Sequence, residues 1–149
     1  MSEQLTIEAV EQEIIDEFAL LDSWGENEKY EFIIDMGKSL PPLADEYKVP
    51  ENIIKGCQST VWLAADYQDG RIYFKADSNS VITKGLISML IRVLSGRTPE
   101  EIMDAKLDFI NAIGMRNHLA QTRSNGLLAM VKQMKHYGLA FKARNVDKV

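Results

Sequence analysis

The sequence predicts an α+β fold: a single domain over residues 1–149, in which a small antiparallel sheet of two to three strands packs against several helices. Three observations lead to this class. Apolar residues recur at helical spacing before and after the middle of the chain, two strand-like segments flank one hairpin-type turn, and no repeat or low-complexity linker separates these parts. A chain of 149 residues can bury a core without disulfides or a structural metal.

Two helices are expected at the N-terminal end. The first has an apolar face with charged residues between its members: Ile7, Val10, Ile14, Phe18 and Leu21. Ser23 followed by Glu26 has the form of a capping box, and it predicts where the second helix begins. Pro41 and Pro42 predict its end near Leu40, because a proline cannot donate to the helical ladder and restricts the residue before it.

A β-hairpin is expected next. Residues 60–67 are rich in β-branched and aromatic types, and residues 71–76 alternate polar and apolar as a half-buried strand does. Asp69-Gly70 between them is a hairpin-type turn signal. The residues before Gly56 can add a third strand to this sheet, and the pattern alone does not decide whether they do.

The second half of the chain predicts further helices. Ser78 or Ser80 can cap the first of them, and Gly96 predicts its end. Its expected apolar face comprises Val81, Ile82, Leu86, Met89, Leu90, Val93 and Leu94. Residues 98–101 form a second capping box with proline at the first helical position, which opens a short helix. The last helix is expected to begin near residues 122–124.

Composition and charge exclude several function classes. Acidic residues outnumber basic ones, 22 to 17, with no dense basic run, so no nucleic acid partner is expected. No segment is apolar over the length that spans a bilayer, so no membrane association is expected. The N-terminus lacks the pattern of a secretory signal, and a single free cysteine fits a reducing cytoplasm. One cysteine excludes an internal disulfide and a multi-cysteine metal site made by this chain alone.

Cys57 is the first candidate for chemistry. It lies between a glycine and small polar residues, at the entry to the first expected strand, where Gly56 permits a sharp turn. A thiol reacts as its thiolate, and a cation such as the neighbouring Lys55 raises the thiolate fraction. From the residues alone, a small buried hydrophobe and a reactive thiol are both open interpretations.

The other polar candidates are weaker. His118 and His136 are the two histidines, and neither stands in a recognisable catalytic sequence. Arg123 lies at the expected start of the last helix, either as a solvated side chain or as one that reaches an anionic group. Trp62 is interpreted as packing that can also cover a cysteine pocket. The segment 77–80 is better explained by helix capping than by metal ligation.

Four segments in this order resemble the SufE-like family of sulfur acceptor proteins. They are residues 56–63 (Gly-Cys-Gln-Ser-Thr-Val-Trp-Leu), 76–86, 95–102 and 118–127, the last containing Arg-Ser-Asn-Gly-Leu. The resemblance covers nearly the whole chain. One departure is Ala-Gln-Thr at 120–122, where the family has a proline.

The resemblance implies a fold shared with IscU-type scaffolds and a carrier role for Cys57, which would accept persulfide sulfur from a partner cysteine desulfurase of the SufS type and stimulate it. The pyridoxal phosphate would belong to that partner, and this chain would bind no cofactor or metal. The sulfur would pass to a SufBCD-type iron–sulfur scaffold. The supporting or partner-binding residues that the resemblance indicates are Gly56, Gln58, Ser59, Trp62, Asp77 and Arg123.

Three alternatives remain open from the sequence. The carrier can serve a related desulfurase that feeds another sulfur pathway, such as RNA modification. The chain can be an allosteric activator that carries no sulfur. An independent cysteine enzyme would need a positioned base and an oxyanion site, which the sequence does not offer. The oligomeric state, a homodimer included, is also open.

Overall fold

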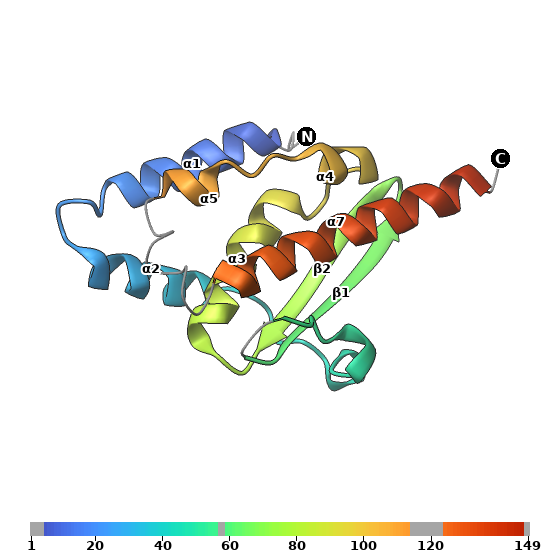
Figure 1. The fold of residues 1–149 in the computed structure, drawn as a ribbon, viewed down its shortest axis with the longest axis horizontal. Helices are drawn as coiled ribbons and strands as arrows, with labels where there is room; N and C mark the ends of the chain where they lie inside the picture. The colour runs from blue at the N-terminus through green and yellow to red at the C-terminus, as the bar shows by residue number, and fades with distance from the viewer. Residues whose placement is uncertain (1–4, 57–58, 114–123, 148–149) are drawn as a thin grey trace.

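A β-hairpin with helices packed against one of its faces organises the computed structural model (Figure 1), which describes residues 5–56, 59–113 and 124–147. In chain order the elements are α1 (Ile7–Ala19), α2 (Glu26–Lys38), the 3₁₀ turns η1 (Asp45–Tyr47) and η2 (Pro50–Asn52), β1 (Val61–Gln68), β2 (Arg71–Ser78), α3 (Val81–Leu94), α4 (Pro99–Asp104), α5 (Phe109–Ala112) and α7 (Ser124–Asp147). The C-terminal turns of α7 extend past the other elements (Figure 1). The architecture is the predicted α+β class.

The hairpin is antiparallel, with Cα pairs running from Val61↔Ser78 to Gln68↔Arg71. Its turn has positive φ at both central residues, 53° at Asp69 and 83° at Gly70, which is the type I′ geometry that matches the twist of two paired strands. The turn is therefore confirmed as the sequence predicts it. The third strand is reduced to one antiparallel bridge between Ile53 and Trp62.

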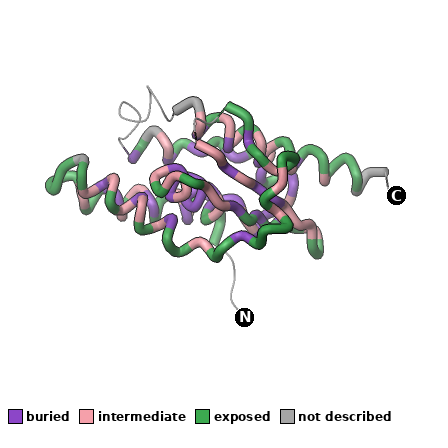
Figure 2. Tube along the Cα trace, turned by 90° about the horizontal axis from the view of Figure 1, so that it is seen from below, coloured by how far each residue is buried: buried purple, intermediate pink, exposed green. Residues whose placement is uncertain are grey.

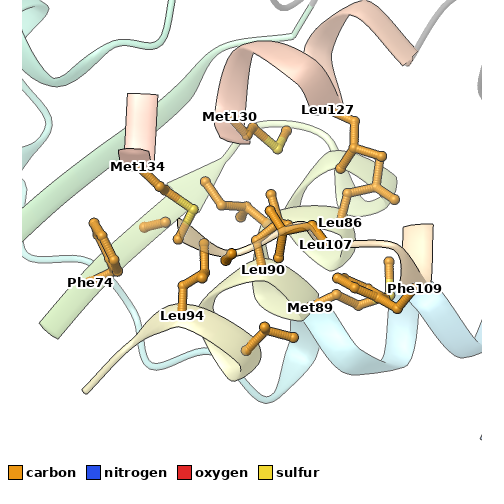
Figure 3. Close-up of a cluster of buried hydrophobic side chains, with 14 of the residues drawn as sticks. Phe74, Leu86, Met89, Leu90, Leu94, Leu107, Phe109, Leu127, Met130 and Met134 are labelled. Carbon is orange, nitrogen blue, oxygen red and sulfur yellow. The ribbon is translucent and has the colours of Figure 1, made fainter. Parts of the chain in front are cut away.

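The core lies between one face of the hairpin and the helices that cover it. Phe74 of β2, Leu90 and Leu94 of α3, and Met130 and Met134 of α7 converge there (Figure 3). Buried residues run through the middle of the molecule, and exposed ones gather at its ends (Figure 2). The helical faces follow the predicted periodicity, because each helix places its apolar stripe on the hairpin or on another helix.

The far edge of β2 is covered by the turn that follows α3. Ile72 N–H donates to Arg97 O at 2.8 Å, and Gly96 N–H donates to Ile72 O at 2.7 Å. Phe74 N–H donates to Ser95 Oγ at 3.0 Å. These bonds satisfy strand groups that an open edge would leave to water or to another chain.

The predicted caps have mixed outcomes. Thr98 and Glu101 form the capping box of α4, and Ser80 Oγ accepts from Thr83 N–H to cap α3. The Ser23 capping box is wrong: α2 begins at Glu26, and its cap is Gly25 with φ of 102° and no side-chain bond. A glycine in that conformation turns the chain directly into the helix, so Glu26 is its first residue rather than its third.

One member of the predicted α3 face is also misplaced. Val81 is 61% exposed, because it is the first residue of α3 and lies beyond the part of the helix that meets the core. Ile87, which the prediction omitted, is fully buried. Within the described residues, every helix is too short or too polar to cross a bilayer.

Candidate functional site

The chain segment that carries the single cysteine is the 55–60 loop, between η2 and β1. Ile54 N–H donates to Val61 O at 2.9 Å, and both residues are buried, so the two ends of the loop meet at a fixed base. Cys57 and Gln58 lie outside the described residues. The residues on either side of them define the site.

Gly56 turns the chain just before Cys57. Its φ is 95°, in the region that favours glycine, as the sequence predicts for this position. A Cβ added to Gly56 would lie 3.4 Å from Cβ of Ala129, near the start of α7. Gly56 therefore lies against the first turns of α7, the helix that crosses the hairpin in Figure 1.

Thr60 holds the C-terminal end of the 55–60 loop. Thr60 N–H donates to Asn79 Oδ1 at 3.1 Å, and Thr60 O accepts from Asn79 N–H at 3.2 Å and from Ser78 Oγ at 2.8 Å. Ser80, next in the chain, caps α3. The same short turn therefore holds the loop and starts the helix behind it. Ser59, a predicted site residue, is half-buried beside Thr60.

Asp77 lies on the sheet face opposite the core. Its Oδ1 accepts from Ser78 N–H at 2.8 Å. Lys48 Nζ is 3.4 Å from Oδ2, and Lys84 Nζ is 3.5 Å from Oδ1. Burial raises the pKa of Asp77, but the Ser78 N–H and the charges of Lys84 and Lys48 outweigh it and hold that pKa below its ordinary value. Asp77 is therefore ionised at neutral pH.

Trp62 stands opposite Asp77 in the register of the hairpin. The side chain of Trp62 is half-buried on the outer face, and Lys48 Nζ lies 5.6 Å from the centroid of its ring. The packing interpretation holds in part: the indole covers the outer face of the sheet and meets the segment that enters the 55–60 loop.

The structure brings Gly56, Ser59, Trp62 and Asp77 to one end of the hairpin. Arg123 lies outside the described residues and directly precedes Ser124, where α7 begins. Gln58 and His118 also lie outside them. His136 is exposed on the outer surface of α7.

Sequence reasoning missed four residues that hold this end of the molecule: Lys48, Thr60, Asn79 and Lys84. The signal for Asn79 was present, since asparagine commonly binds backbone groups in turns. Lys48 gave no local signal, because its partner Asp77 is distant in sequence.

The described contacts on either side of Cys57 fix the two ends of the segment that carries it. Among the described residues, no three His, Cys, Asp or Glu side chains gather to hold an ion. What the geometry provides is a short loop, tied at both ends, with a backbone turn directly before the only thiol of the chain. Such a loop can present a thiolate to another macromolecule.

Comparisons with known proteins agree with the earlier resemblance. The family model of SufE, described as an Fe-S metabolism associated domain, matches residues 12–138. An uncharacterised SufE-like protein of Rhizobium etli is 37% identical over 139 residues, covering 89% of this chain and 91% of that protein. A SufE-like protein of Synechocystis is 38% identical over 114 residues, 76% of this chain and 72% of that protein.

One further relative and one solved structure extend the comparison. SufE-like protein 1 of Arabidopsis thaliana, named chloroplastic/mitochondrial, is 39% identical over 120 residues, which cover 80% of this chain and 32% of that protein. The solution structure of a hypothetical protein from Thermus thermophilus has a TM-score of 0.71 at 16% identity, covering 88% of this chain and 94% of that chain, which shows the shared fold. The chain therefore belongs to the SufE family, and its role is sulfur transfer in iron–sulfur metabolism.

Proposed function

We propose that this protein is a sulfur carrier in which Cys57 accepts persulfide sulfur from a cysteine desulfurase, stimulates that enzyme and delivers the sulfur to a SufBCD-type scaffold. One observation carries the proposal. A member of a sulfur-transfer family with a single cysteine can hold sulfur covalently on a thiol only at Cys57. The carrier is an accessory protein that acts in the reducing cytoplasm, where a lone thiol stays free.

The transfer step is a thiol exchange. The Cys57 thiolate attacks the outer sulfur of the desulfurase persulfide, and a new S–S bond forms to Cys57 Sγ while the S–S bond in the desulfurase breaks. The desulfurase cysteine leaves as a thiolate, and Cys57 becomes the persulfide. The exchange needs no outside oxidant or reductant. The pyridoxal phosphate that releases sulfur from free cysteine belongs to the desulfurase.

The geometry of the 55–60 loop supports this role. The Ile54–Val61 bond and the three bonds at Thr60 hold the base of the loop, so the chain on both sides of Cys57 is anchored to the hairpin. Exchange between two proteins requires both sulfur atoms to approach within bonding distance, and a thiol on a loop with anchored ends can be presented to a partner in this way.

Replacement of Cys57 tests the proposal. Cys57→Ser is expected to keep the fold and lose both sulfur acceptance and stimulation of the desulfurase, because a hydroxyl is a far weaker nucleophile at neutral pH. Desulfurase turnover, thermal melting and the intact mass of the chain after incubation with desulfurase and cysteine measure the three effects.

The outcomes separate the candidate functions. A wild-type chain that gains the mass of one sulfur atom at Cys57 supports the carrier. Full stimulation by folded Cys57→Ser would exclude it and leave an activator that carries no sulfur. A loaded chain that fails to supply the SufBCD-type scaffold would direct the sulfur to another pathway.

A further inference from the structure

Asp77, next to last in β2, and Asn79 in the turn that follows contact the chain before the 55–60 loop and the residue where the loop ends. Through Lys48, Asp77 reaches the 45–54 segment, which enters the loop, and Asn79 holds Thr60, where the loop ends. Lys84 joins the same carboxylate to the first turn of α3. The end of β2 and the turn after it thus hold the chain before the loop, the chain after the loop and the first turn of α3.

The burial of this cluster distinguishes it from an ordinary surface ion pair. The side chains of Asp77, Lys48 and Lys84 are 15%, 32% and 26% exposed. On the same face of the sheet, Asp66 and Lys75 form a pair at 3.2 Å whose side chains are 41% and 47% exposed. Exposed pairs contribute little to stability, whereas a half-buried carboxylate depends on its cations.

We propose that Asp77 is a positioning residue for sulfur transfer: its carboxylate, held between Lys48 and Lys84, keeps the entering side of the 55–60 loop against the hairpin and so sets where Cys57 meets the desulfurase. This inference rests on the proposed function. Asp77 acts through the two lysines. Exchange between two sulfur atoms is sensitive to small displacements of the nucleophile, so loosening this anchor costs rate more than stability.

Asp77→Asn tests the role of the charge. The amide keeps the shape of the side chain and an oxygen for Ser78 N–H, and it loses the charge that holds the two lysines. Sulfur transfer at saturating desulfurase is expected to fall about fivefold, with the half-saturating desulfurase concentration unchanged. The melting temperature should change by only about 2 °C or less.

Two further variants ask whether the cluster acts as a unit. Asp77→Glu is expected to restore part of the rate, because it returns the charge. Adding Lys48→Met to Asp77→Asn is expected to cause little further loss, since both changes break the same contact. A fully additive loss in the double variant would overturn the proposal.

The rate of Cys57 alkylation by iodoacetamide, followed by intact mass spectrometry, measures the accessibility of the thiol without any desulfurase. The chain has one cysteine, so the mass change reports Cys57 alone. The alkylation rate depends on how easily the reagent reaches the thiol, and loss of the anchor in Asp77→Asn is expected to raise that rate about threefold over the wild type. An equal or slower rate in the folded variant would overturn the positioning role.

Asp66→Asn is the matched control. It removes the same charge from the same sheet face, away from the 55–60 loop, and should change neither transfer nor alkylation. Equal effects in Asp66→Asn and Asp77→Asn would overturn the proposal, because they would reflect the general charge of the hairpin. If wild-type Cys57 accepts no sulfur, the proposed function fails, while the alkylation rates still decide whether Asp77 positions the loop.

Discussion

The contact between α2 and α3 and the end of the hairpin at the 55–60 loop are held in opposite ways. Between the helices, two glycines let the backbones approach closely: a Cβ on Gly85 would lie 2.0 Å from Ile33 O, and one on Gly37 would lie 2.8 Å from Gly85 N. At the hairpin end, polar side chains span the gaps, with Lys–Asp distances of 3.4 Å and 3.5 Å.

The two kinds of contact respond differently when the chain is displaced. Helices packed backbone to backbone cannot shift without opening a void or a clash, so their contact is nearly all-or-none. Ion pairs and hydrogen bonds between side chains at the hairpin end can lengthen in small steps, so removing one of them weakens the contact gradually. The molecule therefore packs α2 and α3 backbone to backbone and holds the ends of the 55–60 loop with polar side chains.

The largest expected effect is at Gly85. Gly85→Ala places a methyl group against the backbone of Ile33, which cannot rotate away, so α2 and α3 must separate. The free energy of unfolding is expected to fall by about 3 kcal/mol or more. Urea denaturation measures it.

Gly25→Ala is the control for strain without a clash. Gly25 has φ of 102° and no neighbour within 4 Å of an added Cβ, so the cost should be limited to about 1 kcal/mol. A loss in Gly85→Ala no greater than that in Gly25→Ala would show that α2 and α3 can separate cheaply.

Much of the fold follows from local patterns in the sequence. The periodicity of α1 from Ile7 to Phe18, the Asp69-Gly70 turn and the capping box at Thr98 each depend on residues close in sequence, and each is confirmed. Leu21 was wrongly included in the first helix, because α1 ends at Ala19. The start of α2 was misjudged because Ser23 and Glu26 fit the capping-box pattern, whereas the backbone at Gly25, with φ of 102°, starts the helix two residues later.

The site could be predicted only in part. The sharp turn at Gly56 could be predicted, because glycine adopts backbone conformations that other residues avoid. The family resemblance indicated Trp62 and Asp77 as site residues. The link from Asp77 to Lys48 depends on how the 45–54 segment folds back over the sheet. That contact is long-range, and no local pattern encodes it. Cys57 and Arg123 themselves lie outside the described residues.

A smaller effect on stability and a clear one on function are expected at Gly56. Gly56→Ala forces a side chain into a conformation with φ of 95°, at a cost of about 1 kcal/mol. The turn before Cys57 should then change, and sulfur transfer should fall more than the melting temperature suggests. Desulfurase stimulation and thermal melting of the same sample measure both.

Gly70→Ala provides the comparison at the opposite end of the hairpin. Its φ of 83° carries similar strain, and an added Cβ would have no neighbour within 4 Å. It should lose similar stability and keep its sulfur transfer. Equal losses of transfer in the two variants would mean that hairpin stability, rather than the turn at Gly56, limits the reaction.

The smallest effect concerns the ion pair that links α1 to α3. Arg92 Nη1 and Nη2 donate to Glu17 Oε1 and Oε2 at 2.9 Å and 2.8 Å. These bonds, together with the charge of Arg92, lower the pKa of Glu17 below its ordinary value of 4.5, although partial burial raises it. A lowered folded-state pKa means that the pair stabilises the fold above pH 4.5 and loses that contribution as the pH falls further.

Glu17→Gln should therefore cost less than about 1 kcal/mol at neutral pH, because the pair is partly exposed. The difference from the wild type should shrink in acid, once the wild-type carboxyl is protonated as well. Urea denaturation of both proteins at about pH 7 and about pH 3 measures it. Glu13→Gln, which removes a single contact at 3.6 Å to Arg92, should cost less still. A difference that persists at the acid pH would assign the loss to packing between α1 and α3, because protonation removes the charge but leaves the shape of the side chain.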